Sequence, residues 1–173
     1  MGFVDSFRRV LVGFDGSPDA AEALRLAGAM CDSGELVVLC VVSRALPADS
    51  RGEGSDGAGL RMEAELLLRK LALGADLGDL DKVSVQVVSS GGDSPGNVVT
   101  RYAREHGFDL LVLGRHGAGG RRKSMLGRVA ERAARACRVP VLLVGAPGRD
   151  ANAQVLRGQA SSGVYVRPDQ ANW

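Results

Sequence analysis

Three glycines in the C-terminal half of the chain have the spacing of an anion-binding loop. They form the pattern Gly114-x2-Gly117-x9-Gly127, which lies between an apolar run and a segment with helical periodicity. Glycine lets the backbone approach an anion closely, and the free N–H groups and the dipole of a helix start favour negative charge. The spacing therefore predicts a phosphate site at the point where a strand is followed by a helix.

The charge around these glycines is strongly positive. Between Gly114 and Arg138, eight basic residues stand against one acid, Glu131, whereas the whole chain has a net charge of only +2. Positive charge confined to one segment fits a phosphate site and argues against a general affinity for nucleic acid.

Three other phosphate-loop patterns are incomplete. Residues 117–124 are similar to a Walker A loop, but Arg122 stands where that loop requires glycine. Residues 90–94 are similar to the SGGxDS loop of ATP-dependent adenylating enzymes but are one residue short, and a turn followed by a helix cap explains them. The GxGxxG pattern of dinucleotide-binding loops does not follow the first predicted strand.

Apolar runs predict the strands that position these glycines, at residues 10–14, 36–42, 83–88, 110–113 and 141–144. Several runs are continuously apolar, which is typical of strands covered on both faces in a parallel sheet. Ser17 and Ser94 each precede a proline and predict helix starts. The predicted helices span about 18–30, 60–75 and 95–106, with a fourth from about 126. This alternation predicts a three-layer α/β/α fold around an open, five-stranded parallel sheet, which is a Rossmann-like architecture.

Length and composition predict one domain in a reducing compartment, the cytoplasm. A chain of 173 residues with 45% apolar content is long enough for one well-buried core. Its three cysteines, Cys31, Cys40 and Cys137, are an odd number without metal-ligand spacing. The N-terminal segment lacks an apolar signal region, and the longest apolar run, 36–42, is too short to span a membrane.

Two segments are expected to lie outside the packed fold. Residues 45–59 are rich in glycine and charge, which predicts a mobile loop within a domain covering residues 1–145. Residues 146–173 predict a weakly ordered C-terminal tail. Within it, Val164-Tyr165-Val166 has the composition of a short edge strand, but a frayed tail is the preferred interpretation.

The order of the motifs resembles the universal stress protein family. VLVGFDGSPDA, VVLCVV, GDSPGN, FDLLVLGRHGAGG, the glycine pattern and VPVLLV follow one another between residues 9 and 144. In that family the box G-x2-G-x9-G-(S/T) marks the branch that binds ATP. The resemblance implies an adenine-nucleotide α-hydrolase-like fold, a homodimer, and binding of ATP or AMP, with or without Mg²⁺. Arg128 stands where the family has Ser or Thr. The arginine either replaces the hydroxyl with a charged contact to phosphate or fills the phosphate site with its bulk.

The resemblance also implies which residues bind the nucleotide. Beside the adenosine it places Gly13, Phe14 and Asp15, with main-chain groups of Val41 and Val42 at the adenine edge. At the ribose and phosphates it places Gly114, Arg115, His116 and Gly117, with Gly127, Arg128 and Val129 at the phosphates themselves.

Some of these residues have structural interpretations as well. Asp15 could be a turn residue before the Ser17 cap, and the two valines could be ordinary core. His116 has neither a nucleophile nor a carboxylate beside it in the sequence, so we expect a solvated or phosphate-proximal histidine rather than a general base.

The sequence therefore predicts a nucleotide-responsive stress regulator that signals to an unknown protein partner. The last strand should lie at the sheet edge and pair with a second copy, with Val141 and Leu143 at the centre of the dimer. Two alternatives remain, a nucleotide-free dimeric adaptor of the same fold and an ATP-using enzyme of adenylating type. No catalytic constellation is evident, so we expect at most weak ATP hydrolysis. Nucleic acid and membranes are not expected partners.

Overall fold

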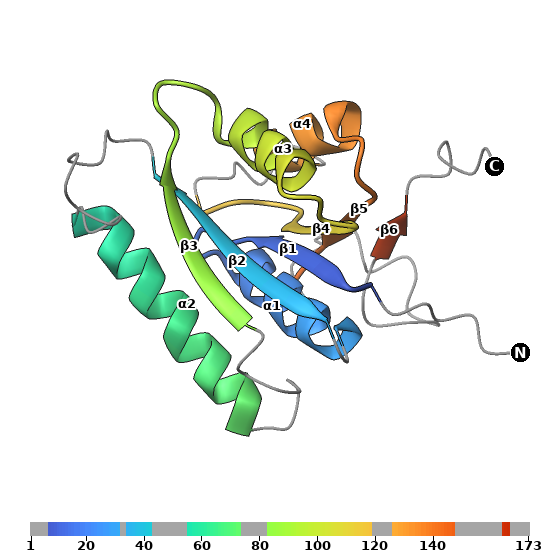
Figure 1. Cartoon of the computed structure of the whole chain (residues 1–173). Helices are drawn as coiled ribbons and strands as arrows, with labels where there is room; N and C mark the ends of the chain where they lie inside the picture. Colours follow the sequence, from blue (N-terminus) through green and yellow to red (C-terminus); the bar gives the residue numbers. More distant parts are fainter. Residues whose placement is uncertain are drawn as a thin grey trace, which may run out of the picture.

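The fold is given by a computed structural model, which describes residues 7–31, 34–42, 55–73, 83–118, 126–147 and 164–166. Strands and helices alternate along the chain, as predicted, and the strands form one sheet (Figure 1). The strands are β1 (Arg9–Gly13), β2 (Glu35–Val42), β3 (Val83–Ser89), β4 (Leu110–Gly114), β5 (Val141–Val144) and β6 (Val164–Val166). The helices are α1 (Pro18–Met30), α2 (Ser55–Leu73), α3 (Pro95–Glu105) and α4 (Arg128–Ala136).

The strand order in the sheet is β3-β2-β1-β4-β5-β6. The pairs β1–β2, β2–β3, β1–β4 and β4–β5 are all parallel, which confirms the predicted five-stranded parallel sheet. The chain proceeds outward from β1 to β3 and then returns to place β4 on the other side of β1. Open α/β sheets bind ligands at such a reversal, beyond the carboxyl ends of the strands.

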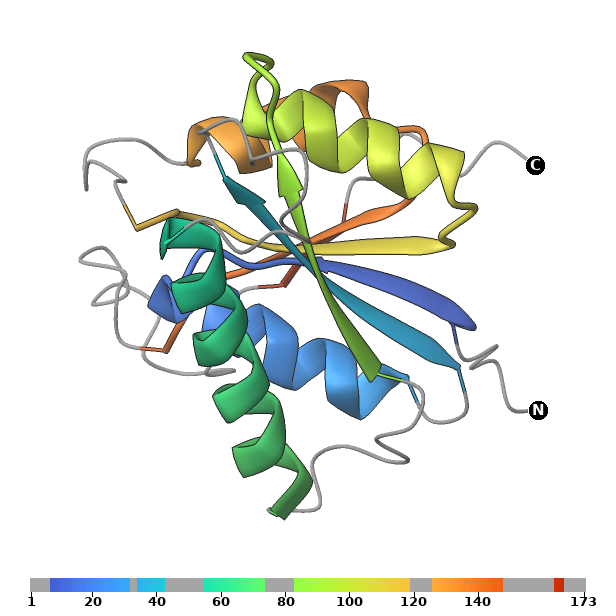
Figure 2. The ribbon, with the colours of Figure 1, turned by 60° about the vertical axis from the view of Figure 1, so that its left-hand side comes forward.

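Helices cover both faces of the sheet. Figure 2 shows α3 and α4 on one side and α1 and α2 on the other. Alternate residues of each strand enter opposite cores: Val10 and Val12 pack with α1, whereas Leu11 and Leu111 pack with α3 and α4. Burying each of these side chains contributes roughly 1.5–3 kcal/mol. The continuously apolar runs of the sequence are therefore explained by strands that are covered twice.

Serine caps fix the starts of two helices as predicted. The Oγ of Ser17 accepts a hydrogen bond from the N–H of Ala20 at 3.1 Å, and the Oγ of Ser94 accepts one from Asn97 at 3.2 Å. In both helices a proline occupies the first turn, where its missing N–H costs nothing. Helix α4 starts at Arg128, two residues after the predicted position, and its N-cap Gly127 provides no side-chain hydrogen bond.

Helix α2 begins earlier than predicted. Residues 55–59 are helical, although the sequence predicts that they belong to a mobile loop. Each of the two glycines in this stretch costs a helix about 1 kcal/mol, and this is why the composition of residues 55–59 indicates a loop. Further along the helix, Arg61 and Glu65 form an ion pair at 3.0 Å, and Leu67 packs against the core that α1 shares with the sheet. Residues 45–54 of the predicted loop lie outside the described residues.

The C-terminal edge of the sheet also differs from the prediction. Strand β5 is not at the edge, because β6 pairs with it in antiparallel orientation. The interpretation of Val164–Val166 as part of a frayed tail is therefore wrong. An outer strand presents a row of unpaired N–H and C=O groups, and even a short strand satisfies several of them. The remaining parts of the predicted tail, 148–163 and 167–173, lie outside the described residues.

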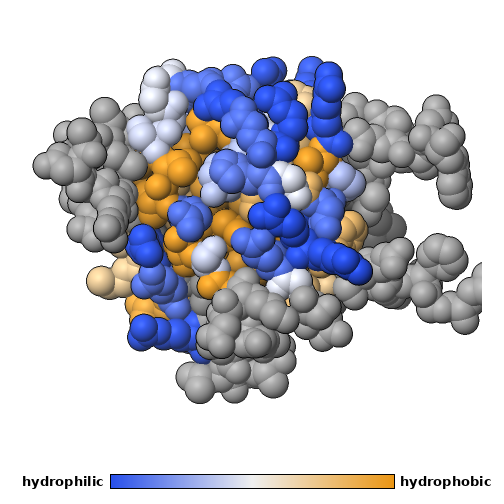
Figure 3. All heavy atoms as spheres, viewed as in Figure 1, coloured by the Kyte–Doolittle hydropathy of each residue, from blue (hydrophilic) through white to orange (hydrophobic). Residues whose placement is uncertain are grey.

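The sheet is not fully covered on its β3 side. Figure 3 shows apolar residues at the surface between α2 and the α3–α4 pair, in the region where β2 and β3 lie.

Among the helices that the structure describes, none combines the length and apolarity needed to cross a membrane.

Candidate functional site

A cleft of about 660 Å³ opens beyond the carboxyl ends of β1 and β4, at the reversal of strand order. Its volume lies within the range of small-molecule sites. The loop after β1, the end of β2, the starts of α3 and α4 and the loop after β4 line it. The sequence elements that were predicted to hold a nucleotide are thus brought to one place by the fold.

Every predicted nucleotide-binding residue lines this cleft except Val42. The lining residues among those predicted are Gly13, Phe14, Asp15, Val41, Gly114, Arg115, His116, Gly117, Gly127, Arg128 and Val129. Val42 is 5% exposed, and its carbonyl accepts a hydrogen bond from the N–H of Ser90 at 2.8 Å. Its main-chain oxygen therefore joins β2 to the turn after β3.

Asp15 joins the loop after β1 to the loop after β4. Its Oδ1 accepts the N–H of Ser17 at 3.0 Å, as a turn residue would, and its Oδ2 accepts the N–H of Ala118 at 3.0 Å. A Cβ on Gly117 would lie 2.6 Å from that Oδ2. Glycine at position 117 thus makes room for the protein's own carboxylate.

Asp19 is a residue of this site that the sequence analysis missed. It lies in the first turn of α1 and is 1% exposed, yet its carboxylate reaches two other segments. Its Oδ2 accepts the backbone N–H of His116 at 3.0 Å, and its Oδ1 accepts the N–H of Ala146, which follows β5, at 3.1 Å. A Cβ on Gly114 would come within 2.9 Å of the Asp19 Cβ, so this packing requires glycine there. An acid in the first turn of a helix was the available signal, but it indicates only a favourable dipole interaction.

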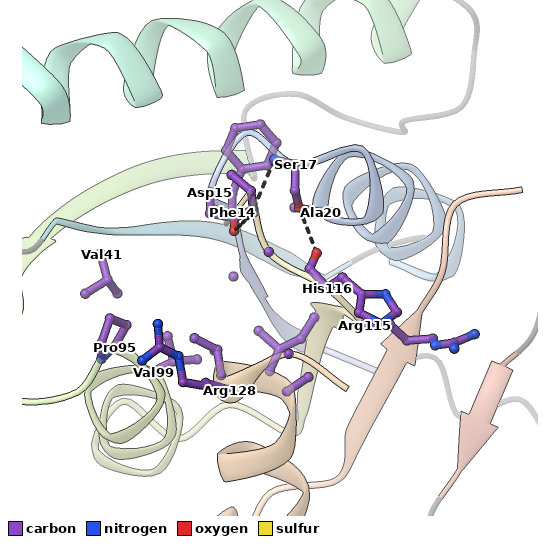
Figure 4. A pocket seen from close by; sticks show the side chains of 18 of the residues that line it. Phe14, Asp15, Ser17, Ala20, Val41, Pro95, Val99, Arg115, His116 and Arg128 are labelled. Carbon is purple, nitrogen blue, oxygen red and sulfur yellow. Dashed lines mark hydrogen bonds between the residues drawn. The ribbon is translucent and has the colours of Figure 1, made fainter. Parts of the chain in front are cut away.

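His116 has a carboxylate partner, contrary to the expectation from the sequence. Its Nδ1 lies 3.1 Å from Oδ2 of Asp19, although 97 positions separate the two residues. Ser17 also contributes, because its Oγ lies 3.2 Å from the carbonyl oxygen of His116 (Figure 4). The imidazole is 25% exposed and extends to the same side as Arg115. Neighbouring residues in the sequence could not reveal this partner, because the fold brings it from a distant part of the chain.

The two arginines of the cleft point in different directions. Arg115 leans against the residue after β5, where a Cβ on Gly145 would lie 3.3 Å from its Cδ. Its backbone connects the site, since its N–H donates to Val144 at 2.8 Å and its carbonyl accepts from Gly127 at 2.7 Å. Arg128 extends from the start of α4 toward Pro95 and Val41, across one side of the cleft (Figure 4).

Helix α4 presents its first turn to the cleft. Gly127, Arg128, Val129 and Ala130 all line the space. The N–H groups of a first helical turn have no partner within the helix, and here the N-cap residue has no side chain to satisfy one. An anion in the cleft would meet these groups and the positive end of the helix dipole.

The turn at 90–94 lies outside the cleft lining. Gly91 and Gly92 have φ of 59° and 87°, and Ser94 caps α3, so the turn-and-cap interpretation is confirmed. Hydrogen bonds from Asn97, from the N–H of Ser94 and from Arg101 hold the pKa of Asp93 below its ordinary value. The turn resembles an adenylating-enzyme loop in sequence, but it does not lie at the cleft.

Comparison with known proteins identifies relatives of the fold. The model of the universal stress protein family matches residues 6–163. A universal stress protein solved in complex with cAMP is 21% identical, with a TM-score of 0.62 over 82% of this chain and 99% of that chain. UspA from Lactobacillus plantarum is 18% identical, with a TM-score of 0.61 over 81% and 99%. A family protein from Arabidopsis thaliana with AMP bound is 17% identical, with a TM-score of 0.55 over 82% and 93%.

Proposed function

Because the chain belongs to the universal stress protein family, we propose that it binds an adenine nucleotide, ATP or AMP, in the cleft beyond β1 and β4. The observation that carries the proposal is the cleft itself, which gathers the loop after β1, the glycine pattern and the uncapped start of α4 around one space. Two structural neighbours, crystallised with cAMP and with AMP, support the choice of an adenine nucleotide.

The chemistry of the lining sets the proposed orientation. The adenosine lies near Val41 and the backbone of Phe14, beside Asp15, because the side chains of Val41, Val99 and Leu113 give the cleft an apolar lining there. The phosphates lie beside Gly127, at Arg128 and Val129, where the N–H groups of the first turn of α4 attract negative charge. Mg²⁺, where it accompanies ATP, is held mainly by the phosphates and by water.

Signalling to another protein completes the proposed role. Loops around the cleft are joined to β5 through Asp19 and through the N–H of Arg115, so a ligand at the glycine pattern can act on that strand. We propose a cytoplasmic regulator of the stress response that works as a homodimer through β5. Leu143 is 2% exposed and packs beneath α3 and α4 together with Val141, so the dimer would use the β5 backbone rather than these side chains.

A nucleotide-free adaptor is the second candidate, and two observations favour it. The N–H groups of His116 and Ala118 already bond to Asp19 and Asp15, which leaves fewer donors in the loop for a phosphate. Arg128 also extends over the cleft in place of the short hydroxyl of the ATP-binding branch. In this alternative the same dimer exposes a surface to its partner without a ligand.

Ligand release and titration decide between the two. The purified protein is denatured, the released small molecules are identified by mass spectrometry, and the stripped protein is titrated calorimetrically with ATP, AMP, cAMP and GTP. We expect saturable binding of ATP or AMP, with GTP much weaker. A ligand at 100 times its Kd stabilises the native state by about 2.7 kcal/mol and raises the melting temperature by several degrees. Absence of heat and of any shift with all four nucleotides would establish the adaptor instead.

Incubation with ATP followed by product analysis addresses the enzyme alternative. We expect at most slow release of ADP and phosphate. Formation of AMP and pyrophosphate on addition of a carboxylate substrate would contradict the proposal and would favour the adenylating-type enzyme.

A further inference from the structure

Strand β6 occupies the backbone edge through which a second copy of the chain would pair. Its register places Leu142 opposite Val166, Leu143 opposite Tyr165 and Val144 opposite Val164. It is the outermost strand of the sheet, beside β5, and its three residues come from the C-terminal part of the chain (Figure 1). The edge of β5 is therefore already used within one molecule.

The orientation of β6 matches that of a symmetric partner. Two copies of β5 related by a two-fold axis run antiparallel to each other, and β6 also runs antiparallel to β5. Both arrangements would use the same outward N–H and C=O groups of Leu143, because the carbonyl of Val144 faces β4, where it accepts the N–H of Arg115. Because each group faces only one neighbour, β6 and a second copy exclude each other at this edge.

We propose that β6 is a removable cover, and that a second copy pairs with β5 only when β6 leaves. The inference takes the pairing of two copies from the proposed function and adds the segment that controls it. The partner is a second copy of this chain, which binds the uncovered edge through the backbone of its own β5 in antiparallel orientation. The pairing that the sequence predicts for an open edge thus becomes conditional on the C-terminal segment.

Strand β6 has a concentration advantage over a second copy in competing for the β5 edge. A strand tethered to the same chain has an effective concentration on the order of millimolar, whereas a second copy competes at its micromolar bulk concentration. Both copies must also release β6 before they pair. If the edge is covered three-quarters of the time, dimerisation is weakened roughly sixteenfold, because the open fractions multiply. A weakly held strand of three residues is thus sufficient to set the oligomeric state.

Strand β5 also connects this edge to the cleft. Ala146, two residues beyond the end of β5, donates its N–H to the buried Asp19, which also holds the loop at His116. The carbonyl of Val144 accepts the N–H of Arg115. A nucleotide that shifts the loop therefore acts on the end of the strand that β6 covers, so ligand and cover are coupled through shared hydrogen bonds.

The test compares self-association of three proteins by sedimentation equilibrium over micromolar concentrations: the full chain, a chain ending at Pro147, and Val164→Pro/Tyr165→Pro. The N–H groups of adjacent strand residues point in opposite directions, so one of the two prolines removes a donor facing β5. The matched control, Gln170→Pro/Ala171→Pro, adds the same prolines beyond β6. We expect the truncated and β6-proline proteins to form dimers with a Kd at least about tenfold lower than that of the full chain and the control.

A synthetic peptide of residues 160–170, added to the truncated protein, should compete for the edge and return it to monomers. Equal dimer constants in all proteins would overturn the inference. A full chain that dimerises while the truncated chain stays monomeric would also overturn it, because β6 would then be exchanged between copies. Calorimetry with ATP on the same samples keeps the two proposals separate, since nucleotide binding without any change in self-association refutes only the cover.

Discussion

Two carboxylates, one exposed and one buried, hold the candidate site in shape together with the glycines. Asp15 and Asp19 accept N–H groups from the loop after β4, and Asp19 also accepts the N–H of Ala146, two residues beyond β5. No buried side-chain oxygen or nitrogen in the described part of the chain lacks a partner. The glycines at 114 and 117 then serve close packing against these two acids as well as approach to a ligand.

Replacing Asp19 should destabilise the fold and weaken the site together. Asp19→Ala removes the buried carboxylate that accepts the backbone N–H groups of His116 and Ala146 and that contacts Nδ1 of His116, which we expect to cost roughly 2–4 kcal/mol of unfolding free energy. Urea unfolding measures the loss, and calorimetry measures the accompanying loss of nucleotide affinity. Glu22→Ala is the control, because it removes an acid of the same helix that forms an ion pair with Arg25 at 2.7 Å, and it should cost less than about 1 kcal/mol. Similar costs for the two variants would contradict the role given to Asp19.

Arg128 decides between the nucleotide-binding protein and the adaptor. If its guanidinium contacts phosphate, Arg128→Ser should weaken ATP about tenfold or more, since a charge-assisted hydrogen bond contributes roughly 1.5–3 kcal/mol. AMP should lose less, because it carries fewer charges, and the salt dependence of ATP binding should decrease.

The matched control for this test is Arg104→Ser, which removes the same charge from a side chain that is 59% exposed near the end of α3. Its affinity should equal that of the parent protein. Tighter ATP binding by Arg128→Ser would identify the arginine as an obstruction and would favour the adaptor.

At the scale of elements, local sequence determined most of what could be predicted. Ser17 and Ser94 caps, and apolar runs covered on both faces, identified β1 to β5 and the starts of α1 and α3, because these signals depend on neighbouring residues. The start of α2 was missed because its glycines and charge are typical of a loop. The pairing of β6 was missed because it depends on contact with a distant segment. Asp19 was missed for the same reason, as its partners lie 97 and 127 positions away.

The start of α3 should give the protein a measurable acid-dependent stability. The pKa of Asp93 is lowered by the side chain of Asn97, the N–H of Ser94 and Arg101, so the folded state favours the carboxylate. This contribution is complete above the ordinary value of 3.8 and is lost as the pH falls through the lowered folded-state pKa. Asp93→Asn should therefore melt below the parent at neutral pH, and the two melting curves should converge in strong acid. The control Glu105→Gln, which removes one charge at the other end of α3, should show no comparable convergence. If the melting temperatures of the parent and Asp93→Asn changed in parallel with pH, Asp93 would not be the source of the acid-dependent stability.

At the scale of the whole molecule, one sheet separates two cores, and the cleft opens where both cores end. Cys40 lies in the core shared with α1, and Cys137 lies in the core beneath α3 and α4. Burial, with a contribution from the charge of Asp15, raises the pKa of Cys40 to about 12, and burial also raises that of Cys137. Since only the thiolate reacts readily, each thiol reports whether its own core has opened.

Thiol labelling should therefore show whether the two cores and the cleft form one cooperative unit. With a maleimide reagent and mass spectrometry of peptides, half-buried Cys31 should react first, while Cys40 and Cys137 should react together, at a slow common rate set by global unfolding. Saturation with the bound nucleotide at 100 times its Kd should slow both buried cysteines about 100-fold, since the ligand stabilises the native state alone. Cys31 serves as the internal control for reagent and access. Fast labelling of Cys137 while Cys40 stays protected would contradict this expectation and would show that α4 opens separately. If the nucleotide then slowed only Cys137, its stabilising effect would be confined to the layer of α3 and α4.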